Sequence, residues 1–243
     1  MCTVTIVPSG NSFFITHSRD EIITRERALS PEVYEVNNHL LLFPKDVKGG
    51  GTWIAINANG NTVVLLNGGF MPHIPNPRYR KSRGLILLEI IASEDTYQTW
   101  QTIQLENIEP FTAILWNNGS LYETRWDGKN RHGRKLNHLE RFIWSSTTLY
   151  DTEALLKRKN WFEAWLSSYT QPTIQDIIHF HLEGGDGDPG NDICMNRDGN
   201  LRTVSLTAVE MTPEKATMKY LDLDDNLWYE KEISFKKCTV ENR

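Results

Sequence analysis

The stretch of sequence that decides the fold is MCTVTIVPSGNSFFITHSRDE, residues 1–21. Two runs within it, Cys2 to Val7 and Ser12 to Thr16, are rich in β-branched and aromatic residues, which favour strands. Between them lies the turn cluster Pro8-Ser9-Gly10-Asn11. Strand, turn and strand in this order predict a β-hairpin at the start of the chain.

The predicted hairpin gathers residues that can carry chemistry. A turn centred on the cluster puts Cys2 opposite about Ser18, so that Arg19-Asp20-Glu21 emerges beside the start of the chain. A guanidinium near a thiol favours the thiolate. A carboxylate there can orient an α-amine at the start of the chain. Each residue alone also fits a plainer interpretation, in which Cys2 is a small residue at a strand start and the charged triplet is a solvated turn.

Removal of Met1 would give Cys2 a proton acceptor of its own. The initiator methionine is normally removed when the second residue is small, as cysteine is. The free α-amine of Cys2 would have a pKa of ~7.7–8.0, close enough to working pH to take the thiol proton. A nucleophile and its base in one residue is the arrangement of N-terminal-nucleophile catalysts.

The rest of the chain is predicted as strands, then helices, then strands. This order favours a layered α+β architecture over alternating βαβ units, and the absence of a linker-like segment predicts one domain over residues 1–243. The predicted helices are Ser82 to Ser93, Glu94 to Leu105, Glu153 to Tyr169 and Ile174 to Leu182. The predicted strands are two in the hairpin over Val33 to Phe43, Thr52 to Asn57, Thr62 to Asn67, Phe111 to Trp116, Leu121 to Trp126, Asp192 to Met195, Thr203 to Met211, Thr217 to Asp222 and Trp228 to Phe235.

Composition excludes several classes of protein. The 243 residues carry 26 basic and 31 acidic side chains, a net charge of −5 that disfavours nucleic-acid binding. Apolar runs such as Leu85 to Ala92 are far shorter than the ~20 residues of a membrane helix. The N-terminus lacks the features of a secretory signal, so the cytoplasm is the expected compartment. Three cysteines do not make a disulfide framework, and Cys194 and Cys238 are expected to be buried, inert thiols.

The chain resembles the NRDE family, also called the Transport-and-Golgi-organisation family. The resemblance rests on ordered motifs, of which the first departs from the family by Ser18 in place of asparagine. These motifs are Met1-Cys2, Ser18-Arg19-Asp20-Glu21, Gly50-Gly51-Thr52-Trp53, Leu65-Leu66-Asn67, Ser82-Arg83-Gly84 and Arg202-Thr203-Val204-Ser205.

This resemblance implies a fold and a set of roles. The family looks like a relative of N-terminal-nucleophile hydrolases of the choloylglycine and penicillin-amidase type, which implies a four-layer αββα sandwich. By that likeness Cys2 is nucleophile and base, and Arg19 and Asp20 support it. Asn67 is the candidate oxyanion donor, and Arg202 returns to the site from a late strand. Some family members are implicated in haem trafficking and lipid metabolism.

Further residues are candidates for binding. His73 follows the strand that ends at Asn67 and is expected at the pocket mouth, and the basic cluster at 78–83 can attract an anion. The predicted substrate-binding set is Ser18, Trp53, His73, Arg80 and Arg83. His179-Phe180-His181 with nearby acids has the composition of a metal site, but its helical pattern separates the two imidazoles. No metal and no cofactor is therefore predicted.

The sequence is compatible with three functions. The first is a cysteine N-terminal-nucleophile amidohydrolase that cleaves a linear amide through a Cys2 thioester. The alternative is a non-catalytic carrier for haem or an acyl-type hydrophobic anion, and a plainer third possibility is a structural protein with a decayed site. The expected partner is thus a small-molecule amide or a hydrophobic anionic ligand, with no nucleic acid and no membrane span.

Overall fold

The structure, a computed structural model, describes residues 2–76 and 78–236. Met1, Pro77 and residues 237–243, which include Cys238, lie outside this range. The strands are β1 (Cys2–Ser9), β2 (Ser12–Ile22), β3 (Leu29–Val36), β4 (His39–Lys45), β5 (Ile54–Asn57), β6 (Thr62–Asn67), β7 (Phe111–Asn117), β8 (Ser120–Trp126), β9 (Arg131–Leu136), β10 (Phe142–Ser145), β11 (Asn196–Arg197), β12 (Leu201–Met211), β13 (Lys215–Asp222) and β14 (Leu227–Ser234). The helices are α1 (Arg83–Ile91), α2 (Thr96–Thr102), α3 (Thr152–Ser167) and α4 (Ile174–Glu183).

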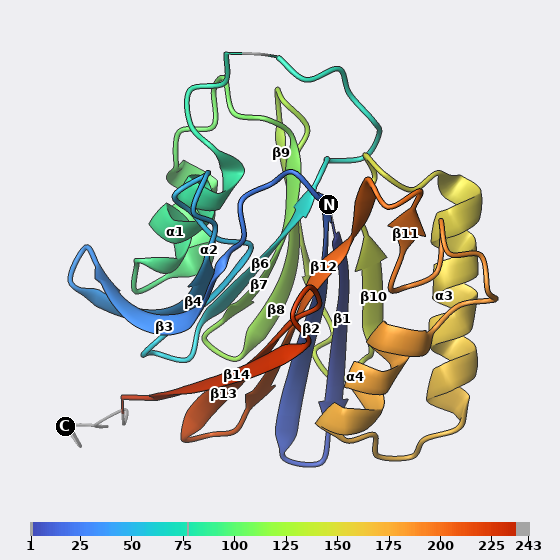
Figure 1. Ribbon diagram of the computed structural model, residues 1–243. Coiled ribbons are helices and arrows are strands. Elements are labelled where there is room, and N and C mark those ends of the chain that lie inside the picture. The colour runs from blue at the N-terminus through green and yellow to red at the C-terminus, as the bar shows by residue number, and fades with distance from the viewer. Residues whose placement is uncertain (1, 77, 237–243) are drawn as a thin grey trace.

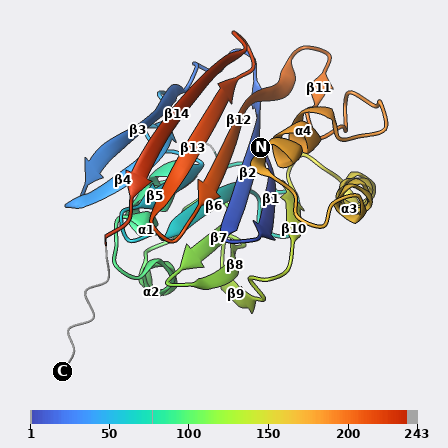
Figure 2. The ribbon, with the colours of Figure 1, turned by 90° about the horizontal axis from the view of Figure 1, so that it is seen from below.

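Two antiparallel sheets form the centre of the molecule. The first has the order β10-β1-β2-β12-β13-β14, with β11 paired to β12, and the second runs β3 to β9 in sequence order. Helices α3 and α4 cover the first sheet, and α1 and α2 cover the second (Figures 1 and 2). The predicted α+β class and its αββα layering are confirmed.

The N-terminal hairpin is present, but its register differs by one residue from the prediction. Cys2 pairs with Arg19 rather than with Ser18, because Ser9 pairs with Ser12 and the loop holds two residues. Gly10 adopts a φ of +58° in this loop, a conformation that costs glycine little. Since directly paired residues project to the same face of a sheet, the thiol of Cys2 and the guanidinium of Arg19 lie side by side.

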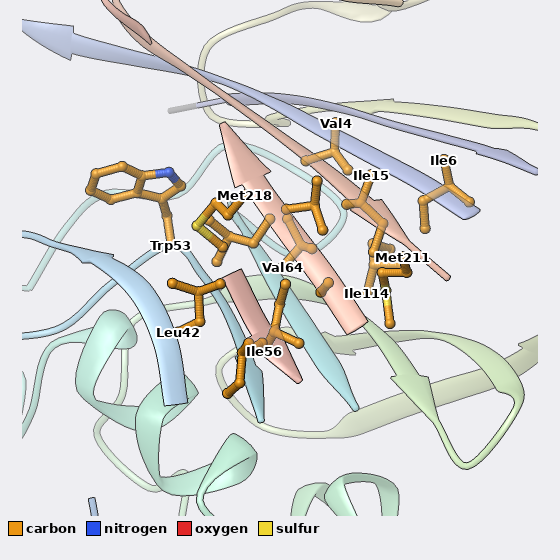
Figure 3. Close-up of a cluster of buried hydrophobic side chains, with 14 of the residues drawn as sticks. Val4, Ile6, Ile15, Leu42, Trp53, Ile56, Val64, Ile114, Met211 and Met218 are labelled. Atoms are coloured by element: carbon orange, nitrogen blue, oxygen red, sulfur yellow. The ribbon is translucent and has the colours of Figure 1, made fainter. Parts of the chain in front are cut away.

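The largest core lies between the two sheets (Figure 3). Val4 and Ile6 of β1 and Ile15 of β2 enter it from one side, and Val64 and Ile114 enter it from the other. All five side chains are almost fully buried. Because side chains alternate along a strand, Cys2 lies on the same face of β1 as this core, at its end.

The helices bury apolar faces against the outer surfaces of the sheets. Helix α1 packs on β5 and β6, and α4 packs on β2 and β12. The Oγ of Ser82 accepts a hydrogen bond from the Leu85 amide and caps α1, while Thr173 and Asp176 form a capping box at α4. Among the described residues, no helix is both long and apolar enough to cross a membrane.

Some elements differ from those predicted. The stretch from Asp192 to Met195 is a turn rather than a strand, and the short β11 follows it. Strands β9 and β10 were not predicted, because β9 is a polar edge strand without apolar alternation and β10 has only four residues. The predicted helix over 94–105 is limited to α2, which begins after its cap at Asp95.

Candidate active site

A cavity of about 250 Å³ opens at the end of the inter-sheet core where β1 begins. The arrowhead end of β6 lies close to the N-terminus in Figure 1, and both border this cavity. Five residues predicted for the site line it together: Cys2, Arg19, Trp53, Asn67 and Arg83. The rest of the lining is Glu21, Arg25, Asp46, Gly51, Thr52, Leu65, Ser82, Gly84 and Glu109.

Cys2 lines the cavity and is almost fully buried. Cys2 is only 4% exposed, and burial raises the pKa of its thiol above the ordinary value. The Asp20 carboxyl acts on this pKa in the same direction, and the guanidinium of Arg19 opposes it. The thiol is therefore protonated at neutral pH and needs a proton acceptor before it can attack a carbonyl.

The side chain of Arg19 stacks on the indole ring of Trp53 beside Cys2. Its guanidinium carbon lies 4.5 Å from the ring centroid of Trp53, a cation–π geometry. The nearest carboxylate oxygens belong to Glu21, 3.6 Å from Arg19 Nη2, and to Asp46, 3.9 Å from the same atom. Arg19 thus has a fixed position and a positive charge directed at the cavity.

Other lining residues form further ion pairs. Arg25 Nη2 lies 2.5 Å from Asp46 Oδ2, and Arg83 Nη2 lies 3.1 Å from Glu109 Oε2. His73 also contacts Glu109, with 3.2 Å between its Nε2 and Oε1, but His73 itself does not line the cavity. Three guanidiniums and three carboxylates therefore line the cavity, and its wall is close to neutral overall.

Asp20 projects from the other face of β2, behind the cavity. Its Oδ2 accepts a 2.7 Å hydrogen bond from the Tyr150 hydroxyl, and its Oδ1 accepts a 2.8 Å bond from Thr203 Oγ1. Burial raises the pKa of this carboxyl, and the nearby Arg158 guanidinium works against that rise. Asp20 is completely buried and does not line the cavity.

Ser18 also faces the helical side of the sheet. Its Oγ lies 2.7 Å from His181 Nδ1, and the Oγ1 of Thr5 lies 2.8 Å from His181 Nε2. The imidazole thus joins α4 to β1 and β2. Ser18, predicted to bind substrate, does not line the cavity.

We expect His181 to make the folded state sensitive to acid. Burial lowers the pKa of His181 to about 3 from 6.5, so the unfolded chain binds its proton first as the pH falls. The stabilisation is present above pH 6.5 and is lost progressively toward pH 3. Between pH 7 and pH 5 this group alone should reduce the free energy of unfolding by about 2 kcal/mol.

Urea denaturation at the two pH values checks this expectation. His181→Gln should flatten the pH dependence by that amount, whereas His179→Gln, a change at an exposed imidazole in the same helix, should leave it as in the wild type. An unchanged pH slope in His181→Gln would contradict the assignment.

Two predicted residues lie away from the cavity. The Arg80 guanidinium donates to the backbone carbonyls of Gln104 and Glu106, and it is exposed. Arg202 pairs with Asp224 on the surface. Neither lines the cavity, because each arginine is held by a partner elsewhere.

Nothing in the described part of the chain groups three or more potential metal ligands. His179 is exposed beside Glu183, whereas His181 is buried, so the two imidazoles diverge on the helix. Cys194 is partly buried, and burial raises the pKa of its thiol.

A family model described as Transport and Golgi organisation 2 matches residues 1–184. The chain belongs to the Transport and Golgi organisation 2 family. A search of curated proteins found no significant match.

Solved structures similar to this family member are hydrolases by name. A mutant of the conjugated bile acid hydrolase from Clostridium perfringens has a TM-score of 0.60 at 9% identity, covering 97% of both chains. The N-acylethanolamine-hydrolyzing acid amidase orthologue of Caenorhabditis elegans has a TM-score of 0.56 at 10% identity, covering 85% of this chain and 92% of the other. At such low identity the likeness establishes the fold alone.

Sequence reasoning missed two acidic residues of this Transport and Golgi organisation 2 site. Asp46 follows β4, and Glu109 precedes Pro110 in the loop before β7. Both reach the cavity that Cys2 lines through long-range packing, so no local pattern marked them. Their only sequence signal is a lone charge at the edge of a strand.

Proposed function

We propose that this protein is an N-terminal-nucleophile hydrolase that cleaves a linear amide through Cys2. The observation that carries the proposal is the pairing of Cys2 with Arg19 at a cavity, with Asp20 on the reverse face of the strand that holds Arg19. The likeness in fold to two amide hydrolases supports it.

Activation begins with removal of Met1. The α-amine of Cys2 then takes the proton from its own thiol, whose raised pKa makes such a base necessary. The resulting thiolate lies beside the Arg19 guanidinium, which stabilises the negative charge. Asp20, on the other face of the strand, offsets the positive charge of the ammonium group.

The thiolate attacks the carbonyl carbon of the amide. A C–S bond forms, and the carbonyl oxygen becomes an oxyanion for which Asn67 is the candidate donor. A donor aimed at this oxygen stabilises the transition state by ~2.7–4 kcal/mol. The C–N bond then breaks, and the ammonium group of Cys2 returns the proton to the leaving amine, which leaves a thioester on Cys2.

Water completes the cycle. The α-amine accepts a proton from water, the hydroxide attacks the thioester carbon, and the C–S bond breaks. The acid leaves, and the thiol regains its proton. The net reaction converts one amide and one water into one acid and one amine.

Intact-protein mass spectrometry tests the proposal. The purified chain should have the mass expected without Met1, and p-nitroanilides of short acyl groups should release p-nitroaniline while adding an acyl mass at Cys2. Retention of Met1 would remove the α-amine and overturn this mechanism. Absence of both product and adduct across the acyl series would overturn the hydrolase assignment.

The alternative of a carrier for haem or an acyl chain has less support from this cavity. Ligand pockets commonly hold ~300–1,000 Å³ and are mostly apolar. The cavity beside Cys2 holds about 250 Å³ and is lined by six charged side chains.

A further inference from the structure

The turn that follows β10 is hydrogen-bonded to the first residue of β1. Thr3 and Ser145 are paired in the ladder between β1 and β10, and the amide of Ser146 donates a 2.9 Å hydrogen bond to the carbonyl oxygen of Cys2. Ser146 is completely buried and does not line the cavity. Its backbone therefore holds the main chain of Cys2 from outside the cavity.

The side chain of the same serine reaches the second sheet. Ser146 Oγ donates a 2.7 Å hydrogen bond to the carbonyl oxygen of Asn67, the last residue of β6. The arrowheads of β6 and β10 both end near the N-terminus in Figure 1, in agreement with these two bonds. Since Cys2 and Asn67 both line the cavity, Ser146 connects two lining residues that belong to different sheets.

The residue after Asn67 packs directly on the same turn. Gly68 has a φ of +87°, and a Cβ on it would overlap the hydroxyl of Thr147 and lie 2.8 Å from Cγ2 of Thr148. Glycine therefore permits this close approach. On its other side, the Gly68 amide donates a 3.0 Å hydrogen bond to the carbonyl of Pro110. The end of β6 is thus held by its own sheet on one side and by the turn after β10 on the other.

We propose that Ser146 is a positioning residue, whose hydroxyl holds Asn67 in place relative to the thiol of Cys2. The inference rests on the proposed function for the reaction that this placement serves. A donor to a developing oxyanion acts only when it is aimed at that oxygen, and a displacement of about 1 Å can lower a rate about a hundredfold. Ser146 acts through the two backbones and not on the substrate, because it lies outside the cavity.

Ser146→Ala would remove the link between the sheets and keep the rest of the turn. The amide at this position would still bind the Cys2 carbonyl, and its carbonyl would still accept the 3.2 Å hydrogen bond from the Tyr150 amide. The hydroxyl would lose its bond to Asn67 and its 3.4 Å contact with Thr148. The substitution therefore isolates the contact on which the proposal depends.

Amide hydrogen exchange tests this contact without requiring any reaction. Ser146→Ala should speed exchange at residues 66–69 by about fivefold or more, because the Asn67 carbonyl loses its donor and the end of β6 opens more often. Ser93→Ala is the matched control, since Ser93 Oγ also donates to a backbone carbonyl, that of Ile90 at 2.6 Å, in a partly buried site after α1. It should leave exchange at residues 66–69 as in the wild type.

Two reactions of Cys2 test what the placement does. With p-nitrophenyl acetate the sulfur forms a C–S bond, an oxyanion develops on the carbonyl oxygen, and p-nitrophenolate leaves as the C–O bond breaks. With iodoacetamide the same sulfur displaces iodide and no oxyanion forms, and in both reactions the thiol proton passes to solvent. The ratio of the p-nitrophenolate burst rate to the alkylation rate should fall about tenfold to a hundredfold in Ser146→Ala. Ser146→Thr retains the hydroxyl and should keep most of the wild-type ratio, as should Ser93→Ala.

Each outcome decides the matter. Unchanged exchange at residues 66–69 in Ser146→Ala would overturn the contact between the sheets, whether or not the protein hydrolyses amides. Faster exchange with an unchanged ratio would overturn the positioning role, because a purely structural contact alters both reactions of Cys2 alike. A ratio in Ser146→Thr as low as in Ser146→Ala, at wild-type stability, would also overturn it. Faster exchange without a burst in the wild type would support the contact and count against the hydrolase.

Discussion

Replacing Cys2 by alanine is expected to lower amide turnover by about a million-fold and to abolish the acyl adduct. Loss of the nucleophile removes the covalent path entirely, and losses of this size follow removal of a nucleophile in a covalent hydrolase. The Cys2 thiol is buried among groups that already hold the site together, so its loss should cost about 1 kcal/mol of stability or less. Release of p-nitroaniline and intact mass after incubation measure the effect.

Two controls make the Cys2 result specific. Cys194→Ala removes a partly buried thiol outside the cavity and should retain full turnover. Cys2→Ser retains a weaker nucleophile beside the same α-amine and should fall between the alanine variant and the wild type. Undiminished turnover in Cys2→Ala would exclude Cys2 as the nucleophile.

Replacing Arg158 by methionine is expected to destabilise the fold by about 3–5 kcal/mol. Arg158 lies in α3 and is 1% exposed, with its guanidinium carbon 3.5 Å from the ring centroid of Tyr150. It donates hydrogen bonds to the carbonyls of Asn191 and Asp192 and to the hydroxyl of Thr3. Removing it takes these hydrogen bonds away from the two partly buried carbonyls, while the Thr3 hydroxyl keeps only its contact with Ser145.

The charge of Arg158 also acts on the pKa of the Asp20 carboxyl, which lies on the reverse face of β2 from Arg19. Its positive charge opposes the rise in the pKa of Asp20 that burial causes. Without Arg158, that pKa should rise further, so the methionine variant should lose turnover at neutral pH beyond what unfolding explains.

Urea denaturation with Arg202→Met as the control separates these effects. Arg202 is an arginine on the surface, with a side chain 36% exposed beside Asp224. A pair of this kind contributes about 1 kcal/mol or less. If both variants lost the same stability, the structural role assigned to Arg158 would be wrong.

The N-terminal hairpin shows which features the local sequence can predict. Its strands and turn are readable because β-branched runs flank Pro8-Ser9-Gly10-Asn11. The register of the two strands cannot be read from the sequence, because that turn cluster accommodates either a two-residue or a longer loop. The one-residue difference moves Ser18 from the cavity side to the face of α4 and puts Arg19 opposite Cys2.

The basic cluster at 78–83 shows what local sequence does not determine. Arg83 and Arg80 occupy one basic cluster in the sequence, and only Arg83 lines the cavity. The first turn of α1 carries Arg83 to the wall, while Arg80 precedes the helix and is held by the loop before β7. A basic cluster in the sequence thus identifies a segment that can attract an anion. It does not identify which of its side chains lines the cavity.

By itself, the sequence determined the order of strands and helices, the layered α+β class, the family motifs and the isolated position of Cys2 at the start of a strand. These follow from patterns with periods of two or of three to four residues, which are local. Only the tertiary structure decided that Asp46 and Glu109 line the same cavity as Cys2 and that Asp20 lies outside it, bonded to Tyr150. Those placements depend on the packing of two sheets and on a register set by the whole hairpin, so no single segment of the chain contains them.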